Sequence, residues 1–140
     1  MTEAEPAKWR RTPWSSLGAW LILGVAAIMA LNTARAFLDP AAFAAYMGLP
    51  LRDGASDGFV LIYGLRAAFL GLIAVVLLWR GEMTALAAFA AVAVVMPIGD
   101  AILTAGSHAP TALVARHGAS AVYLAVAAFL LHRWSQKNAI

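Results

Sequence analysis

Four long apolar stretches, separated by short polar segments, follow one another along the chain. An α-helix rises about 1.5 Å per residue, so each stretch is long enough to cross the ~30 Å hydrocarbon core of a bilayer. The pattern predicts an all-α integral membrane protein whose spans form a four-helix bundle in a single transmembrane domain, residues 17–134. The predicted spans are residues 17–38, 58–80, 84–105 and 111–133.

A short helix is predicted between the first two spans. Asp39 followed by Pro40 is a strong helix start, with the acid as N-cap and proline at the first helical position. Gly48 suits the position just after a helix C-terminus, so this helix covers residues 40–47. It is too short to cross a bilayer, and we expect it to lie in the interface and to roof part of the bundle. The side chains expected to face lipid or the bundle are Phe43 and Met47.

The composition fits a membrane protein, because 63% of the residues are hydrophobic and 12% are charged, about half the usual charged share. The net charge of +3 does not indicate nucleic-acid binding, since the basic residues are scattered around the spans. Lys and Arg favour the cytoplasmic side, and they concentrate on one side of the four-span order. Both termini, a flexible segment 1–16 and a tail 135–140, are therefore expected on the cytoplasmic side of the cell membrane. The residues on that side are Lys8, Arg10, Arg11, Arg80, Arg133 and Lys137.

An alternative interpretation of the first span is a cleaved signal peptide. Basic residues precede the apolar stretch, and Ala34-Arg35-Ala36 resembles a small-x-small cleavage site. The stretch is already long enough to span, and Arg35 lies inside the supposed site. Retention as the first helix is favoured, with cleavage after Ala36 left open.

Several kinds of chemistry are excluded by residue type. The chain has no cysteine, which rules out disulfides, thiolate catalysis and cysteine metal sites. It carries no glycine-rich phosphate loop or zinc-protease motif. His108 and His132 lie at opposite ends of the last span, so His117 has no second histidine beside it. No cofactor and no metal are expected.

An acid within the third span marks the candidate site. Asp100 follows Pro97 and Gly99; the proline should kink the span, and the glycine should let another backbone come close. An ionisable group at this depth is costly and normally faces a partner or a cavity. Arg66 in the second span and His117 in the fourth lie at a similar depth, about 8–12 Å below the same surface at 1.5 Å per residue.

An Arg66–Asp100 ion pair is the predicted contact at this depth. The third span has few strongly apolar residues, and one central acid largely cancels its insertion free energy, whereas the second span has insertion free energy to spare. The pair could be purely architectural. Further side chains at this depth are expected to bind a ligand with Arg66, Asp100 and His117; they are Tyr63, Asn32, Arg35, Thr104 and Ser120.

Two arginines near this layer have simpler interpretations. Arg35 can pair with Asp39 four residues later or extend to the headgroups. Arg116 is expected to extend to the headgroups as well. Neither is needed for the predicted ion pair.

The order of short motifs resembles a small four-span membrane family, number 4267 among the domains of unknown function, and is more loosely similar to DoxX-like proteins. The resemblance covers about residues 17–131 and implies the four-span fold, with Arg66, Asp100 and His117 at shared positions. The family pattern has an acid after the arginine of the second span, where this chain has Ala67. That difference leaves Asp100 as the sole acid in the spans and argues against a two-carboxylate mechanism. The motifs are Pro40…Phe43-Ala44…Gly48-Leu49-Pro50, Tyr63-Gly64-Leu65-Arg66, Pro97-Ile98-Gly99-Asp100-Ala101 and His117-Gly118.

Three functions fit these residues. The first is a non-enzymatic membrane protein whose polar pocket, in the outer leaflet, binds a small hydrophobic or anionic, lipid-like ligand or a partner subunit. The second is a membrane enzyme of the isomerase type, in which His117 and Asp100 move a proton and Arg66 holds an anion or enolate. The third is a small transporter, which would have to act as a homo-oligomer because four spans rarely enclose a pathway alone.

Overall fold

The computed structural model describes residues 13–52 and 56–138. Within these ranges all regular secondary structure is helical, with no strand, and four helices are long and apolar enough to cross a membrane. This confirms the all-α fold and the multi-pass membrane class. The elements are η1 (Pro13–Ser15), α1 (Leu17–Leu38), α2 (Pro40–Tyr46), α3 (Gly58–Trp79), α4 (Met83–Ala93), α5 (Val95–Gly106) and α6 (Thr111–Asn138).

The helix bounds follow the sequence pattern closely. α1 and α3 begin at the predicted residues, and the third span is Met83–Gly106, formed by α4 and α5 together. α6 continues to Asn138, beyond the predicted end of the fourth span. The expected flexibility of residues 1–12 and the last two residues of the predicted tail, 139–140, lie outside the described residues, whereas residues 13–15 form the short helix η1.

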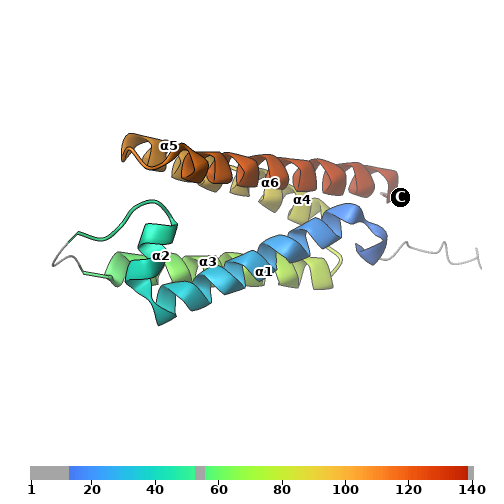
Figure 1. Cartoon of the computed structure of the whole chain (residues 1–140). Coiled ribbons are helices and arrows are strands. Elements are labelled where there is room, and N and C mark those ends of the chain that lie inside the picture. The colour runs from blue at the N-terminus through green and yellow to red at the C-terminus, as the bar shows by residue number, and fades with distance from the viewer. Residues whose placement is uncertain (1–12, 53–55, 139–140) are drawn as a thin grey trace, which may run out of the picture.

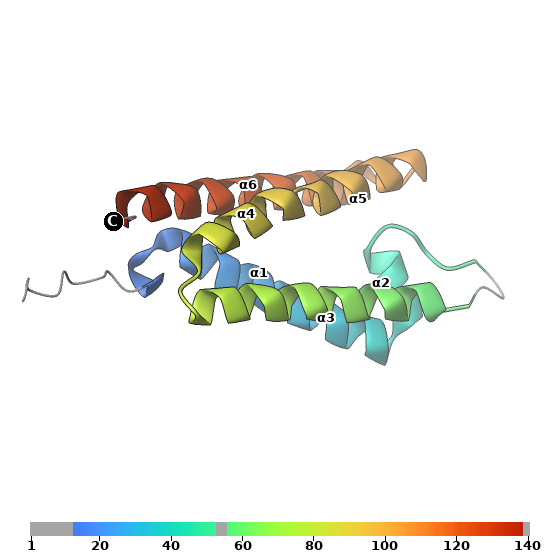
Figure 2. The same cartoon turned by 180° about the vertical axis from the view of Figure 1, so that it is seen from behind.

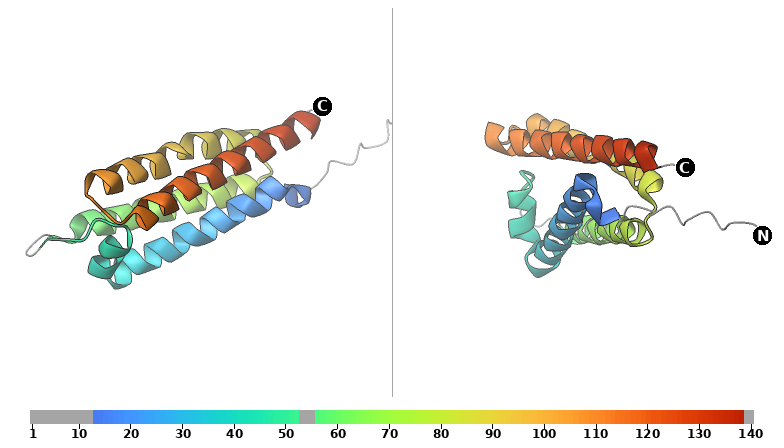
Figure 3. Two further views of the ribbon diagram at one scale, coloured as in Figure 1. Left: turned by 45° about the horizontal axis from the view of Figure 1, so that its top comes forward. Right: turned by 90° about the vertical axis from the view of Figure 1, so that its right-hand side faces the viewer.

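The spans are arranged as two pairs (Figures 1 and 3). α1 packs along α3, α6 packs along both α4 and α5, and α1 also contacts α6. α3 and α4 meet near the turn that joins them, and from there α3 and α5 diverge (Figure 2). The bundle is therefore closed at the end of this turn and wider at the end of α2.

The apolar core lies at the closed end. Its large, almost fully buried side chains are Ile22 from α1, Leu78 from α3, Leu86 from α4 and Leu131 from α6, and alanines from the same helices fill the space between them. Small side chains let helices approach closely, which is a main source of packing energy between membrane helices. The opposite half of the bundle lies outside this core cluster.

Glycines set two of the close helix contacts. A Cβ atom at Gly64 of α3 would lie 2.8 Å from the Cβ of Ala36 in α1, and one at Gly18 would lie 2.9 Å from the side chain of Leu131 in α6. Gly99, predicted to allow such a contact, has no atom within 4 Å of its Cβ position. That prediction was wrong, because Gly99 does not point toward a neighbouring helix.

The third span is interrupted as Pro97 predicted. Proline has no N–H, so the carbonyl of Ala93 loses its usual partner four residues later. α4 ends at Ala93 and α5 begins at Val95, and Val94 between them keeps helical angles (φ −57°, ψ −28°), about one turn before the proline. The interruption lies before Asp100 as expected, and a kink there stays a prediction.

The short helix α2 is also confirmed, with its signals as predicted. The Asp39 carboxylate accepts a hydrogen bond from the Ala42 N–H at 2.9 Å, and Gly48 has φ +84°, the left-handed conformation of a residue after a helix end. Phe43 is buried, with its ring 5.6 Å from the ring of Tyr63 in α3. α2 therefore packs on the bundle rather than lying free in the interface.

Gly64→Val should destabilise the protein by about 1–3 kcal/mol, because the added atoms overpack a tight contact. Gly99→Val is the matched control, since it makes the same change in a helix with open space around the site. Thermal unfolding in detergent measures both variants. An equal loss for the two would mean that helix propensity, not the α1–α3 contact, sets the cost.

Candidate functional site

A cavity of about 330 Å³ lies in the wide half of the bundle, beside α2. All four spans and α2 contribute to its wall. Most of the predicted ligand-binding residues line it, whereas two do not. The lining ones are Asn32 and Arg35 of α1, Tyr63 of α3, Asp100 of α5, and His117 and Ser120 of α6.

His117 is held between two oxygen atoms from different elements. It is buried, with its Nδ1 3.9 Å from Oδ2 of Asp100 and its Nε2 3.4 Å from the carbonyl oxygen of Met47. Asp100 is partly exposed to the cavity. The ring thus connects the acid of the third span to the C-terminal end of α2.

The two contacts of His117 differ in kind. The 3.4 Å separation from the Met47 carbonyl oxygen is within hydrogen-bond reach, whereas the 3.9 Å separation from Oδ2 of Asp100 is too long for a hydrogen bond and is an electrostatic contact. The arrangement thus places an acid and an imidazole side by side in the wall of one cavity.

Arg116 is a cavity residue that the sequence interpretation assigned to the headgroups. Its guanidinium donates to the carbonyl oxygen of Tyr46 and lies over the Tyr46 ring, 4.0 Å from the centroid. The last carbonyls of a helix lack partners and attract cations, and α2 ends at Tyr46. That unsatisfied helix end is the signal by which Arg116 could have been found.

Arg35 reaches the same ring from α1. Its guanidinium lies 5.0 Å from the Tyr46 centroid and lines the cavity. The predicted pair with Asp39 is not among the ion pairs of the described residues, and the Asp39 carboxylate caps α2 instead. Two guanidinium groups and one aromatic ring thus form one wall of the cavity at the α2 end.

The predicted Arg66–Asp100 ion pair is not formed. Within the described ranges His117 is the one ion-pair partner of Asp100, and Arg66 is exposed and does not line the cavity. α3 turns its small residues, such as Gly64, Ala67 and Gly71, toward its neighbours. Arg66 lies next to Ala67 along the chain, about 100° around the helix, so it points out of the bundle at the predicted depth.

Thr104 is the other predicted residue outside the cavity wall. It is fully buried, and its hydroxyl donates to the carbonyl oxygens of Asp100 and Ala101 in its own helix. A Cβ atom at Gly48 would lie 3.2 Å from its methyl group. Thr104 therefore packs the end of α2 against α5 and is a structural residue.

The cavity changes from polar to apolar along the bundle. The polar residues lie near the α2 end, and deeper along each span the wall is apolar. On α3 the order is Tyr63, Leu70, Ala74, and on α6 it is His117, Ser120, Leu124. The apolar wall also includes Ile22 and Val25 of α1 and Phe89 of α4.

These features define a small multi-pass membrane protein with a polar cavity at one end of the bundle. The chain belongs to the family described as Domain of unknown function (DUF4267), whose model matches residues 16–131. Comparisons with curated proteins and with solved structures each gave no match. The looser likeness to DoxX-like proteins stays an expectation.

The contact between Asp100 and His117 predicts a specific pattern of mutational coupling. Asp100→Asn and His117→Gln should show a coupling energy of about 0.5–3 kcal/mol in a double-mutant cycle, because the two side chains are in direct contact. Asp100→Asn with Arg66→Gln should be additive within about 0.5 kcal/mol. Unfolding in detergent measures both cycles. Coupling in the second cycle but not in the first would contradict the Asp100–His117 contact and support an Arg66–Asp100 ion pair instead.

Proposed function

We propose that this membrane protein is a binding protein for an amphiphilic, lipid-like ligand that occupies the cavity beside α2. The polarity gradient of the cavity wall carries this proposal. Ligand sites are mostly apolar, with a few placed polar groups that fix orientation. A ligand with a polar head at the α2 end and an apolar body directed toward Ala74 and Phe89 matches the gradient.

The ligand enters from the lipid. Ile28 and Leu31 of α1 and Met96 of α5 line the cavity and are 40–51% exposed. The cavity therefore reaches the lipid-facing surface.

The head of the ligand is an anion. Arg35 and Arg116 line the polar end, and Asp100 is the acid there. Since Asp100 faces His117, the guanidinium groups are left as the cationic groups for a ligand. A guanidinium suits a carboxylate or a phosphate because its N–H groups form a planar fork.

A membrane enzyme that moves a proton on an apolar substrate is the second candidate. The contact between His117 and Asp100 favours it, because an acid and a base within one cavity are the groups such a reaction needs. Arg116 would then hold the developing negative charge in place of Arg66. Deuterium exchange into a bound substrate, lost in Asp100→Asn, is the observation that would favour this candidate over simple binding.

Decanoate and decanol carrying the same photoreactive group test the binding proposal. Both probes have the same chain, and the carboxylate alone is charged. In nanodiscs the decanoate probe should label the cavity wall, near Leu70 and Phe89, more strongly than decanol does. Arg116→Gln should remove the preference, whereas Arg66→Gln, a matched change outside the cavity, should keep it.

A substitution that fills the apolar end of the cavity provides a second test of the binding proposal. Leu70→Trp should abolish labelling by both probes, because the larger side chain occupies the apolar end. Leu72→Trp makes the same change two residues away on an exposed face and should label as the native protein does. Equal labelling of all variants would show that the probes bind the outer surface and would overturn the proposal.

The orientation in the membrane is a further part of the proposal. The excess of Lys and Arg in the segments expected at the closed end supports a cytoplasmic position for this end and for both termini, and the proposal puts the cavity in the outer leaflet. Reporter fusions at Gly81 and Ile140 should be cytoplasmic, and one at Gly54 should be external. An external Gly81 would reverse the leaflet assignment without affecting the binding test.

A further inference from the structure

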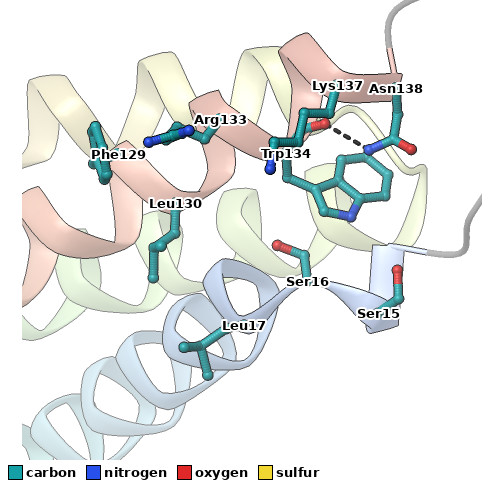
Figure 4. Close-up of a pocket in the computed structure, with 9 residues that line it drawn as sticks. All are labelled: Ser15, Ser16, Leu17, Phe129, Leu130, Arg133, Trp134, Lys137 and Asn138. Atoms are coloured by element: carbon teal, nitrogen blue, oxygen red, sulfur yellow. Dashed lines mark hydrogen bonds between the residues drawn. The ribbon is translucent and has the colours of Figure 1, made fainter.

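A second groove lies at the other end of the bundle, where η1 and the start of α1 meet the last turns of α6 (Figure 4). Its volume is about 660 Å³. Figure 4 shows Ser16 and Leu17 on one side and Leu130, Arg133, Trp134 and Lys137 on the other. The groove is separate from the cavity beside α2 and shares no lining residue with it.

Ser16 is a buried polar residue aimed into this groove. It is 3% exposed, and its hydroxyl caps no backbone N–H of α1. Within the described residues its side chain has no hydrogen-bond partner. Figure 4 shows the hydroxyl pointing across the groove toward α6. The Ser16 hydroxyl is thus available to donate a hydrogen bond to a group bound in the groove.

Two cations of α6 line the same groove, and the guanidinium of Arg133 lies over the Phe129 ring, 5.6 Å from its centroid. Arg133 and Lys137 are one turn apart, so they share a helix face. Both are exposed, and neither has an acidic partner among the described residues. No lining residue of the groove within the described ranges is acidic. The groove therefore has the charge to hold an anion between α1 and α6.

The same groove continues onto the lipid-facing surface. Leu17 is 65% exposed and Phe129 is 56% exposed, and with Leu130 they form its apolar part. Trp134 marks the boundary between headgroups and hydrocarbon, where tryptophan is enriched. An occupant must carry both an anionic head and an apolar chain.

We infer that this groove binds an anionic phospholipid of the surrounding bilayer. The phosphate lies against Arg133, Lys137 and the Ser16 hydroxyl, and one acyl chain runs along Leu17 and Leu130. Basic pockets at the cytoplasmic ends of membrane helices bind anionic headgroups. A soluble anion does not account for the apolar part of the groove. This site is independent of the ligand proposed for the cavity beside α2.

The test measures retention of phosphatidylglycerol and phosphatidylcholine by the full-length protein in a neutral detergent, with native mass spectrometry as the readout. A neutral micelle has no surface charge, so general attraction of basic residues to a membrane is removed. We expect one phosphatidylglycerol per protein, bound at least tenfold more tightly than phosphatidylcholine. Excess inorganic phosphate should not displace it, because the acyl chain contributes to binding.

Variants distinguish lipid binding in the groove from attraction of the lipid by the overall charge of the protein. Arg133→Gln with Lys137→Gln should weaken phosphatidylglycerol binding about 30-fold, since each basic side chain near an anionic headgroup contributes about fivefold. Ser16→Ala should weaken it about tenfold through the lost hydrogen bond to a charged group. Arg52→Gln with Arg80→Gln removes the same charge elsewhere and should bind as the native protein does. Circular dichroism verifies that every variant is folded.

Three outcomes would overturn the inference. They are equal retention of the two lipids, full displacement by inorganic phosphate, and native affinity in the Arg133→Gln/Lys137→Gln variant. Loss of this binding leaves the labelling of the cavity beside α2 unaffected, so the two proposals fail separately.

Discussion

The need to satisfy a histidine buried at membrane depth determines how the wide half of the bundle is assembled. His117 cannot be hydrated by the lipid, and an unsatisfied polar group there costs several kcal/mol. Its two partners come from other elements, the carboxylate of Asp100 in α5 and the carbonyl of Met47 after α2. The residues that follow α2 therefore lie against α5 and α6, where Gly48 meets Thr104 and Leu113 and Arg116 bonds to the end of α2, while Phe43 packs α2 onto Tyr63 of α3.

Hydropathy and helix signals predicted the spans, the short helix and the depth of the polar layer, because these depend on local sequence. The pairing within the layer depends on how each helix is rotated about its axis, which depth does not determine. For α3, however, the rotation of the helix about its axis can be predicted from the sequence. Gly64, Ala67, Gly71 and Ala74 recur at helical spacing and form the packed face, and Arg66 lies to one side of it.

Arg116 and Tyr46 could not be assigned from local sequence, because their contact joins residues 70 positions apart. The contact has two parts, a hydrogen bond to the end of α2 and stacking of the guanidinium on the ring. Both favour arginine over lysine, whose ammonium lacks a planar face. The sequence shows an uncapped helix end and a cation at the right depth. It does not show the tertiary contact that brings Arg116 to the end of α2.

The break in the third span links the packed end of the bundle to the cavity. α4 continues the alanine-rich core through Leu86, Ala87 and Ala90, and a straight helix would extend this close packing along α3. α5, which begins after Val94, diverges from α3 (Figure 2). Asp100 lies one turn after Pro97 on α5, and its partly exposed carboxylate lines the cavity. The proline and the acid of the same helix thus both belong to the cavity wall.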